Sequence, residues 1–339
     1  MSFVLIRKLI PESWILHCSK SLPLSCGAIL MFHHIAPVNR KKIRYNDHLK
    51  VSPEYLDLSL ARLKKGGFSF IPMDEMADLL EKRKRFSKVL SVTFDDGYRD
   101  NLTNGLPVLE HHGVPGLIYV ATGLMRGESV PWWDVLEDYL LETASDFEFE
   151  GQIYAAKTMD EKCQTFLDIR KMIMFDPDQE IRRRLLAAGI LPDGADAGRF
   201  SRDMLTEDDL RRYSSHRLLS FGSHTHTHAA CGKLAQETFE SEVRQSMEIL
   251  QNCGITARHF AFPYGDDVDV WSAFAEILQK REIATAVTTY PGLVRPGSDR
   301  WFLPRIFISE YSGNTVPDEI RALKRHIICQ GIKRRLRRQ

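Results

Sequence analysis

Eight short apolar segments, each long enough for one β-strand, alternate along this chain with segments of helical periodicity. Strands that alternate with helices form parallel sheets with right-handed crossovers. About seven to eight such strands predict an α/β fold built as a distorted, closed or nearly closed (β/α) barrel. The expected strands are residues 28–32, 68–71, 89–94, 116–120, 218–222, 259–262, 283–288 and 302–308.

Two helical segments have clear ends. Leucines recur at helical spacing through residues 56–63, and Gly66 and Gly67 follow them. A second apolar stripe runs through residues 236–252 and stops before Gly254. Apolar residues at this spacing cover one face of a helix, and glycine is common just past a helix end. Both segments are therefore predicted to be helices that cover the sheet.

The length of 339 residues fits one barrel with an insertion better than several separate domains. Residues of about 130–208 break the alternation with charged, mainly helical patterns, and we interpret them as a helical insertion. The expected organisation is an N-terminal segment (1–27), a barrel (28–310) that carries this insertion, and a C-terminal helix with a basic tail (311–339).

Composition excludes several classes of function. The formal net charge of +1 argues against a nucleic-acid-binding protein. None of the six cysteines forms a C-x-x-C pair, which argues against a cysteine-based zinc site or a redox motif. Scattered cysteines in a chain of this size are typical of a reducing compartment.

The two ends of the chain bear on membrane contact. No apolar run reaches the ~20 residues that span a bilayer, and the N-terminus lacks the order of a clear signal peptide. We therefore expect a cytoplasmic protein or one peripheral to the inner membrane face. The C-terminal "IKRRLRRQ" is either a solvated helix end or a contact with an anionic membrane surface.

Polar residues follow four of the predicted strands. Because all strands of a parallel barrel end at the same rim, these residues are expected to meet there. An acidic pair before a glycine also suits a simple turn, but a turn does not account for polar residues after the other three strands. The residues are His33-His34, Asp95-Asp96-Gly97, the run from Ser223 to His228, and Pro263-Tyr264-Gly265.

The histidines of "SHTHTH" have metal-ligand spacing. His224 and His228 stand at i and i+4, so on a helical turn both imidazoles can face one ion. His226 lies between them and is expected to point elsewhere. Two histidines and one carboxylate are a common ligand set for catalytic Zn²⁺, with one position left for water. Either Asp95 or Asp96 can supply that carboxylate and leave the other free for proton transfer.

Three motifs, "TFDDG", "SHTHTH" and "RHFAFPYG", resemble the leading motifs of the polysaccharide deacetylases (carbohydrate esterase family 4, NodB-homology domain) and occur in the same order. The motifs span residues of about 93–265, and the strand pattern extends the likeness to about 28–310. The resemblance implies a distorted (β/α) barrel, a divalent metal, and removal of N- or O-acetyl groups from sugar polymers.

The resemblance also implies roles for single residues. The first aspartate of "TFDDG", Asp95, matches the general base, and Asp96 matches a metal ligand. His224 and His228 match the other two ligands. The metal is expected to be Zn²⁺, although Co²⁺ or another divalent ion suits the same donors.

The third motif supplies two further assignments. Arg258, which opens "RHFAFPYG", matches the arginine that orients the base. Tyr264 matches the residue whose backbone N–H binds the oxyanion.

The general acid departs from the usual pattern. Many members of the family carry an "LxH" motif, but the matching region here, "FLPRIFISE", contains Arg305 and no histidine. Another branch has an aromatic-His pair on the first strand, and Phe32-His33 fits it. His33 is therefore the expected acid, with His34 as the alternative. Arg305 is expected to pair with a carboxylate near the site or to form a purely structural ion pair.

Together these features predict a metal-dependent hydrolase that removes N-acetyl groups from an N-acetylated oligo- or polysaccharide, as a chitooligosaccharide deacetylase does. The alternatives are an O-acetyl esterase, a deformylase acting on a lipid-linked glycan, and a glycan-binding protein without activity. Trp132, Trp133 and Trp301 are candidates for stacking on sugar rings, with core packing as the alternative.

Overall fold

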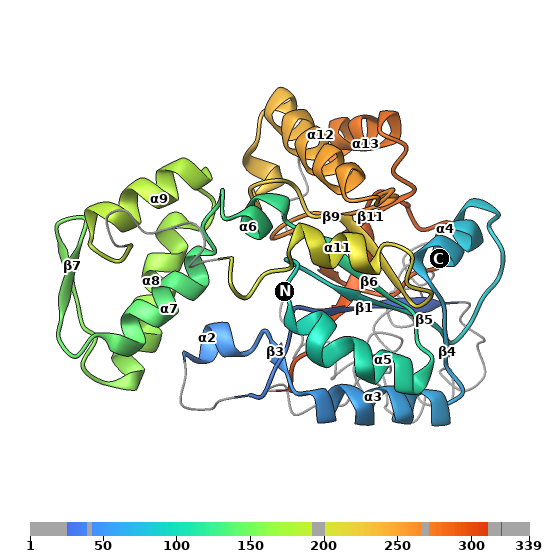
Figure 1. Cartoon of the computed structure of the whole chain (residues 1–339), viewed down its shortest axis with the longest axis horizontal. Coiled ribbons are helices and arrows are strands. Elements are labelled where there is room, and N and C mark those ends of the chain that lie inside the picture. The colour runs from blue at the N-terminus through green and yellow to red at the C-terminus, as the bar shows by residue number, and fades with distance from the viewer. Residues whose placement is uncertain (1–25, 39–42, 192–200, 266–270, 311–319, 321–339) are drawn as a thin grey trace, which may run out of the picture.

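The computed structural model describes residues 26–38, 43–191, 201–265, 271–310 and 320 (Figure 1). Seven parallel strands close into a barrel in the order β1-β12-β11-β10-β9-β6-β5, and β5 pairs back onto β1. The prediction of an α/β barrel is thereby confirmed. The strands are β1 (Gly27–Phe32), β5 (Val89–Phe94), β6 (Gly116–Val120), β9 (Leu219–Ser223), β10 (His259–Ala261), β11 (Thr285–Pro291) and β12 (Leu303–Phe307).

One of the eight predicted strands, at residues 68–71, does not take part in barrel closure. β4 (Ser69–Phe70) pairs with residues 89–90 at the start of β5. Pairing between β5 and β6 begins only at Val92, so the first residues of β5 have a free edge that β4 covers. β4 is therefore a short strand added to a closed barrel.

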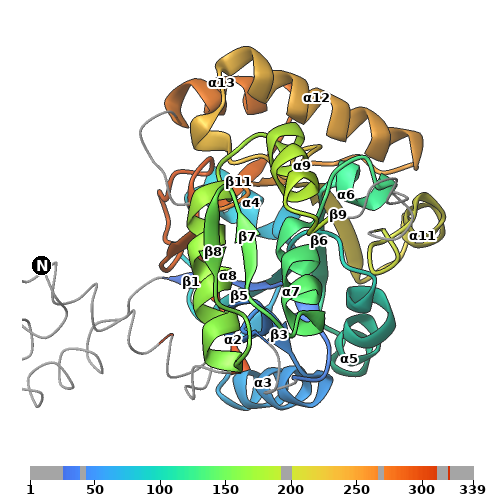
Figure 2. The same cartoon turned by 90° about the vertical axis from the view of Figure 1, so that its left-hand side faces the viewer.

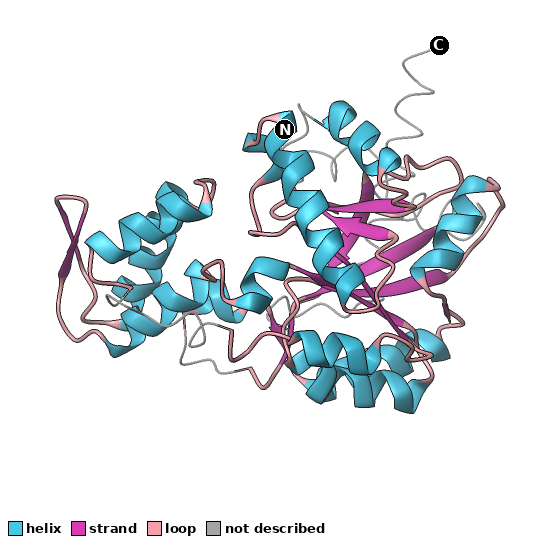
Figure 3. Cartoon of the chain, turned by 45° about the horizontal axis from the view of Figure 1, so that its top comes forward, coloured by secondary structure: helices cyan, strands magenta, loops and turns pink. Residues whose placement is uncertain are grey.

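Helices surround the barrel (Figure 3). In Figure 1, α3 and α5 lie side by side below the strands and α12 and α13 lie above them. The helices outside the insertion are α2 (Arg44–Asp47), α3 (Pro53–Lys65), α4 (Met73–Glu81), α5 (Leu106–His112), α6 (Thr122–Arg126), α11 (Glu207–Tyr213), α12 (Gln236–Asn252) and α13 (Trp271–Lys280), with a π-turn at Asn101–Gly105 and a 3₁₀ turn at Cys231–Lys233. A short pair, β2 (His34–Ile35) and β3 (Lys50–Val51), follows β1.

The two helices expected from periodicity are α3 and α12. The hydroxyl of Ser52 caps α3 by accepting a hydrogen bond from the backbone N–H of Tyr55, and Pro53 occupies the first turn, where its missing N–H costs nothing. Leu56, Leu60 and Leu63 of α3 are buried against the barrel. α12 buries Phe239 and Val243 in the same way.

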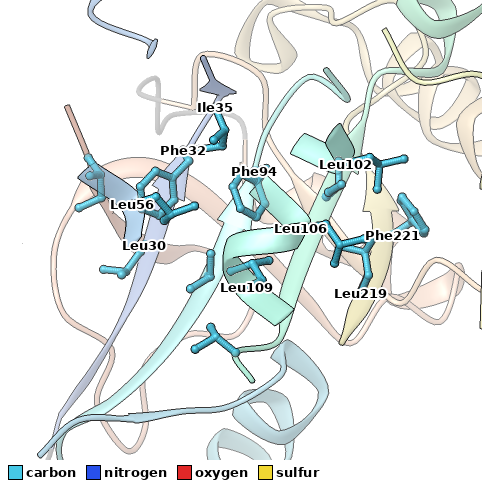
Figure 4. Packing of buried hydrophobic residues seen from close by; sticks show 14 of the residues in the cluster. Leu30, Phe32, Ile35, Leu56, Phe94, Leu102, Leu106, Leu109, Leu219 and Phe221 are labelled. Carbon is cyan, nitrogen blue, oxygen red and sulfur yellow. The ribbon is translucent and has the colours of Figure 1, made fainter. Parts of the chain in front are cut away.

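Alternation along the strands divides the core into two layers. Leu30, Phe32 and Phe94 point outward and pack under α3 and α5, as Figure 4 shows. Ile29 and Tyr119 belong to a second cluster that fills the barrel interior. Because successive side chains point to opposite faces, the inward register of β5 runs through Ser91 and Thr93 and continues to Asp95. The barrel interior therefore becomes polar toward the rim where the acidic pair lies.

Between β6 and β9 the chain leaves the barrel and forms a separate lobe, seen face-on in Figure 2. The lobe contains α7 (Trp132–Glu142), the hairpin β7 (Phe147–Phe149) and β8 (Gln152–Tyr154), α8 (Met159–Ile173) and α9 (Asp178–Ala187). Its apolar side chains, of which Leu136, Phe166 and Ile169 are fully buried, form one cluster with Tyr98 and Leu124 from outside the lobe. The lobe is thus packed internally as well as against the barrel.

Two regions of the predicted organisation fall outside the described residues: most of the N-terminal segment and, apart from Ile320, the C-terminal helix with its basic tail. Among the helices that the structure describes, none combines the length and the apolar character that a bilayer-spanning helix requires.

Candidate active site

Three predicted ligands meet at the rim of the barrel. Asp96 follows β5, and His224 and His228 follow β9. The Asp96 Oδ1 atom lies 3.4 Å from Nε2 of His224 and 3.2 Å from Nε2 of His228. One donor atom from each of the three residues lies within 4.8 Å of the other two. The loops after two separate strands thus direct a carboxylate and two imidazoles toward one point.

The donor atoms have the surroundings of a cation site. Asp96 Oδ1 is buried, and no hydrogen bond within the described structure satisfies it. His224 uses its Nδ1 atom to donate to the carbonyl of Ala261 at 2.8 Å, which leaves Nε2 as the ligand atom. A buried carboxylate oxygen without a hydrogen bond is costly, and a divalent ion between the three donors would remove that cost. The residues therefore fit a metal with nitrogen and oxygen ligands.

The ionisation of Asp96 suits this site. Burial alone raises the pKa of Asp96, but the imidazoles of His224 and His228 outweigh it and hold the pKa well below its usual range. For His228 burial dominates and lowers the pKa, although Asp96 opposes this. An ionised carboxylate and neutral imidazoles are the forms that bind a metal.

Backbone strain is concentrated at this rim. Asp96, Thr225, His228 and Tyr264 all have a left-handed backbone, with φ between 58° and 72°. Such conformations are uncommon for residues with a side chain and cost on the order of 1–3 kcal/mol each. Four of them in three loops that meet at one place indicate that the loops are held for the geometry of the site.

The turn that carries the histidines is fastened from outside by α12. The Glu242 carboxylate accepts hydrogen bonds from the backbone N–H groups of His226 and Thr227, at 2.8 and 2.7 Å, and from the Thr227 hydroxyl at 2.9 Å. The His226 ring points away from the three ligands toward Thr122 and Gln245, as its place between them suggested.

Asp95 lies beside the three ligands and makes a different contact. Arg305, on β12, donates two hydrogen bonds of 2.6 Å to the two carboxylate oxygens of Asp95, and both side chains are buried. Burial raises the pKa of Asp95, but Arg305, His224 and His33 outweigh it, so the pKa lies below its usual range. Of the two roles considered for Arg305, the structure shows the pairing with a carboxylate at the site.

The assignment of Arg258 as the residue that orients Asp95 is wrong in this structure. Arg258 precedes β10 and so lies at the opposite end of that strand from the rim, about 10 Å away at the rise of an extended chain. Its guanidinium instead donates to Asp74 at 2.8 Å on the surface. Arg305 occupies the position that the motif had suggested for Arg258.

Of the two histidines after β1, His33 lines the rim and His34 does not. The Nδ1 atom of His33 is buried and makes no hydrogen bond within the described residues. Burial lowers the pKa of His33, and the carboxylates of Asp96 and Asp95 only partly oppose this. His34 turns the other way, where its Nδ1 atom lies 2.7 Å from the Asp100 carboxylate and its ring stacks on that of Tyr98.

Aromatic side chains enclose the ligand group. The ring of Trp133 lies 4.8 Å from that of His228, and the ring of Tyr264 lies 5.0 Å from it on another side. Trp132 donates its indole N–H to the Tyr264 hydroxyl at 3.0 Å. Trp301 is not among them, because it packs against the cluster under α13, with the Arg300 guanidinium over its ring.

These groups open into a cavity of about 330 Å³ that lies between the barrel rim and the lobe. Asn46, His48 and Arg170 are among the polar residues that line it and were not singled out from the sequence. Their positions depend on how the lobe and the segment after β1 fold against the rim, and no motif marks that packing.

A model of the polysaccharide deacetylase family matches residues 82–280. The putative polysaccharide deacetylase YxkH of Bacillus subtilis (strain 168) is 29% identical over 93 residues, which are 27% of this chain and 30% of that protein. The match therefore covers less than a third of the length of this relative.

Two solved structures have the same fold. Streptococcus pyogenes deacetylase PplD, in complex with acetate, superposes with a TM-score of 0.58 at 18% identity, over 89% of this chain and 99% of that one. IcaB from Ammonifex degensii gives 0.55 at 18% identity, over 89% and 97% of the two chains. Identities this low establish a shared barrel and leave the chemistry to the residues at the rim.

Proposed function

This chain belongs to the polysaccharide deacetylase family, and from that premise we propose that it is a metal-dependent hydrolase that removes N-acetyl groups from an N-acetylated oligo- or polysaccharide. The products are acetate and a sugar with a free amine. The observation that carries the proposal is the convergence of Asp96, His224 and His228 beside a second carboxylate, Asp95, which Arg305 holds in place.

Asp96, His224 and His228 would hold the divalent ion, for which we propose Zn²⁺, with Co²⁺ also compatible with these donors. When bound, the ion would act as a Lewis acid that activates a water molecule and polarises the acetyl carbonyl. The hydrogen bond from His224 Nδ1 to the Ala261 carbonyl fixes the imidazole ring so that Nε2 would be directed to the ion.

Asp95 is proposed as the general base. It accepts the proton of the attacking water, so it must be ionised before the reaction and correctly oriented. The two hydrogen bonds from Arg305 supply both conditions, because they hold the carboxylate plane and lower the pKa against the effect of burial. The positive charge of Arg305 also stays beside Asp95 after the proton arrives.

His33 is proposed as the general acid that donates a proton to the leaving nitrogen. Of His33 and His34, it is the one that faces the cavity. The backbone N–H of Tyr264 is proposed to donate to the oxyanion of the tetrahedral intermediate. A single donor of this kind typically contributes about 10²–10³ in rate, and the left-handed backbone at Tyr264 fixes the direction of its peptide groups.

The test is acetate release from N-acetylglucosamine oligomers by protein that has been stripped of metal and then supplied with Zn²⁺ or Co²⁺, with product mass as a second measurement. Asp95→Asn should abolish release while metal is retained, and His224→Ala should lose both. His216→Ala is the matched control, since His216 pairs with Glu110 on the surface. Release equal to wild type in both Asp95→Asn and His224→Ala would contradict the mechanism.

The substrate panel should also contain an O-acetylated and an N-formylated sugar. Faster turnover of either would identify an esterase or a deformylase built on the same residues. Glycan binding without turnover of any substrate, in protein that holds no metal at neutral pH, would instead support the glycan-binding alternative.

A further inference from the structure

Arg170 is the charged residue that the lobe places at the cavity. Phe166 and Arg170 on α8 and Met174, the residue that caps its C-terminal end, follow one another at intervals of four residues, so they share one face, and all three line the cavity. Phe166 is buried and stacks on Trp132, with ring centroids 6.5 Å apart. The helix thus presents a cation in the middle of an otherwise apolar stripe.

The guanidinium of Arg170 has no counter-ion among the residues that the structure describes. Within the described part of the chain, its side chain makes no hydrogen bond and no ion pair with another residue. The nearest carboxylates in sequence are already engaged, because Asp168 binds Lys171 at 3.0 Å and Asp176 binds Arg184. Arginines at half-buried positions usually pair with carboxylates, and an unpaired one at a cavity indicates an anionic ligand.

The other charges of the cavity do not compensate Arg170. The carboxylate of Asp95 is neutralised by Arg305, and that of Asp96 faces two imidazoles. His48 lines the same part of the cavity, and its burial, assisted by the positive charges of His33 and Arg170, lowers its pKa to about 4. His48 is therefore neutral at pH 7, and Arg170 is the one uncompensated charge on this wall among the residues described.

We propose that Arg170 is an anion-binding subsite and that the substrate carries an oxyanion, a carboxylate or a phosphate, close to the acetamido group that is hydrolysed. This inference rests on the proposed function and narrows it to acidic glycans. A guanidinium matches both groups, because its forked N–H donors bind two oxygens of a carboxylate or a phosphate at once.

The dimensions of the cavity limit where the anion can lie. A volume of about 330 Å³ is at the low end for ligand sites. The ligand group at the rim and Arg170 on the lobe line the same small space, with the apolar faces of Trp132 and Phe166 beside them. The anionic group is therefore expected on the sugar that bears the acetamide or on its immediate neighbour.

The test uses three matched oligosaccharides of N-acetylglucosamine: a neutral one, one with a uronate next to the reactive sugar, and one with a phosphate on it. For wild type, kcat/KM should be roughly 10- to 100-fold higher for at least one acidic substrate, the range expected for one charge-assisted hydrogen bond. The two acidic substrates distinguish a carboxylate from a phosphate. Arg170→Gln should bring the ratio of acidic to neutral kcat/KM close to one, and Arg170→Lys should restore part of it.

Lys171→Gln is the matched control, because Lys171 is the next residue of α8 and its side chain is 67% exposed. It should keep the wild-type ratio. A wild type without preference for either acidic substrate, or an Arg170→Gln variant that keeps the preference, would overturn the proposal.

A binding measurement separates this inference from the proposed deacetylation. The two acidic sugars and the neutral one, in their deacetylated forms, are titrated calorimetrically into wild type and Arg170→Gln. If no substrate releases acetate, the proposed function fails, yet binding of an acidic sugar that is tighter than that of the neutral one and lost in Arg170→Gln still supports the anion subsite. Equal affinity of wild type and variant for all three sugars overturns it.

Discussion

The guanidinium of Arg305 and the carboxylate of Asp95 form a bidentate ion pair inside the barrel, with two hydrogen bonds of 2.6 Å. Arg305 also donates to the carbonyl of Thr288 and lies 5.8 Å from the ring of Tyr119. The arginine is therefore fixed from three directions, and Asp95 takes its orientation from it. This pair connects the stability of the barrel interior with the proposed base.

Arg305→Lys is expected to lower both activity and stability. A lysine keeps the charge but cannot form two parallel bonds to one carboxylate, so acetate release should fall at least about 10-fold, and the free energy of unfolding should fall by roughly 1–3 kcal/mol, less than the cost of removing the charge altogether. Urea denaturation and acetate release measure the two effects. Arg258→Lys, at the surface pair with Asp74, is the control and should change neither; a large loss of activity there would restore the original assignment of Arg258.

His33→Gln is expected to lower kcat by about 10²–10⁴, the usual contribution of general acid catalysis, and to leave the metal content unchanged. An acid must be protonated to act, so activity that depends on His33 is lost as the pH rises through its pKa. The alkaline limb of the wild-type profile of kcat against pH should therefore be absent in the variant. Loss of metal in His33→Gln would make this residue a ligand instead of the acid.

Glu242→Gln is expected to weaken metal binding although Glu242 touches no ligand side chain. The carboxylate holds the turn between the two proposed histidine ligands with three hydrogen bonds, and loss of such outer contacts typically lowers metal affinity by roughly 10- to 100-fold. Competition with a chromogenic chelator measures the affinity. Glu248→Gln lies on the same helix in a surface pair with Arg244 and serves as the control. Equal affinities in the two variants would exclude the positioning role.

His48→Gln is expected to weaken the dependence of the free energy of unfolding on pH below neutrality. The pKa of His48 falls from 6.5 to about 4 on folding. Between these values the unfolded chain binds a proton that the folded chain does not, so stability falls as the pH is lowered from 6.5 to about 4. This residue alone accounts for about 3 kcal/mol over that window. Urea midpoints of wild type and variant across the window test this, and parallel curves would contradict it.

The fold was largely predictable because each barrel strand is a short apolar run between helical segments. Such runs are set locally by hydrophobic periodicity, and seven of the eight became barrel strands. The role of the run at 68–71 was not predictable in the same way. Its pairing depends on how far β6 reaches along β5, and that register follows from the closed barrel as a whole.

The site was predictable where the residues directly follow strands. Asp95 and Asp96 were placed by the end of β5, and His224 and His228 by the end of β9. The orientation of Asp95 was assigned to Arg258, with Arg305 given only as a possible partner of a carboxylate, because the motif gives the order of residues along the chain but not which end of a strand an arginine occupies. The sequence did not single out Arg170, because an arginine near a helix end is common. Only the folded lobe shows that this face of α8 lies toward the rim.

The lobe between β6 and β9 shares its apolar cluster with residues at the barrel rim, and it supplies one wall of the cavity. The proposed hydrolytic groups all come from the barrel and the proposed anion subsite comes from the lobe, so the two proposals assign reaction and recognition to different parts of the chain. A different wall that keeps the contacts of Trp132 and Trp133 with the rim is expected to change which sugar is accepted while the proposed hydrolytic groups stay the same. A chimaera that carries another lobe on this barrel would be a direct way to make deacetylases with new preferences.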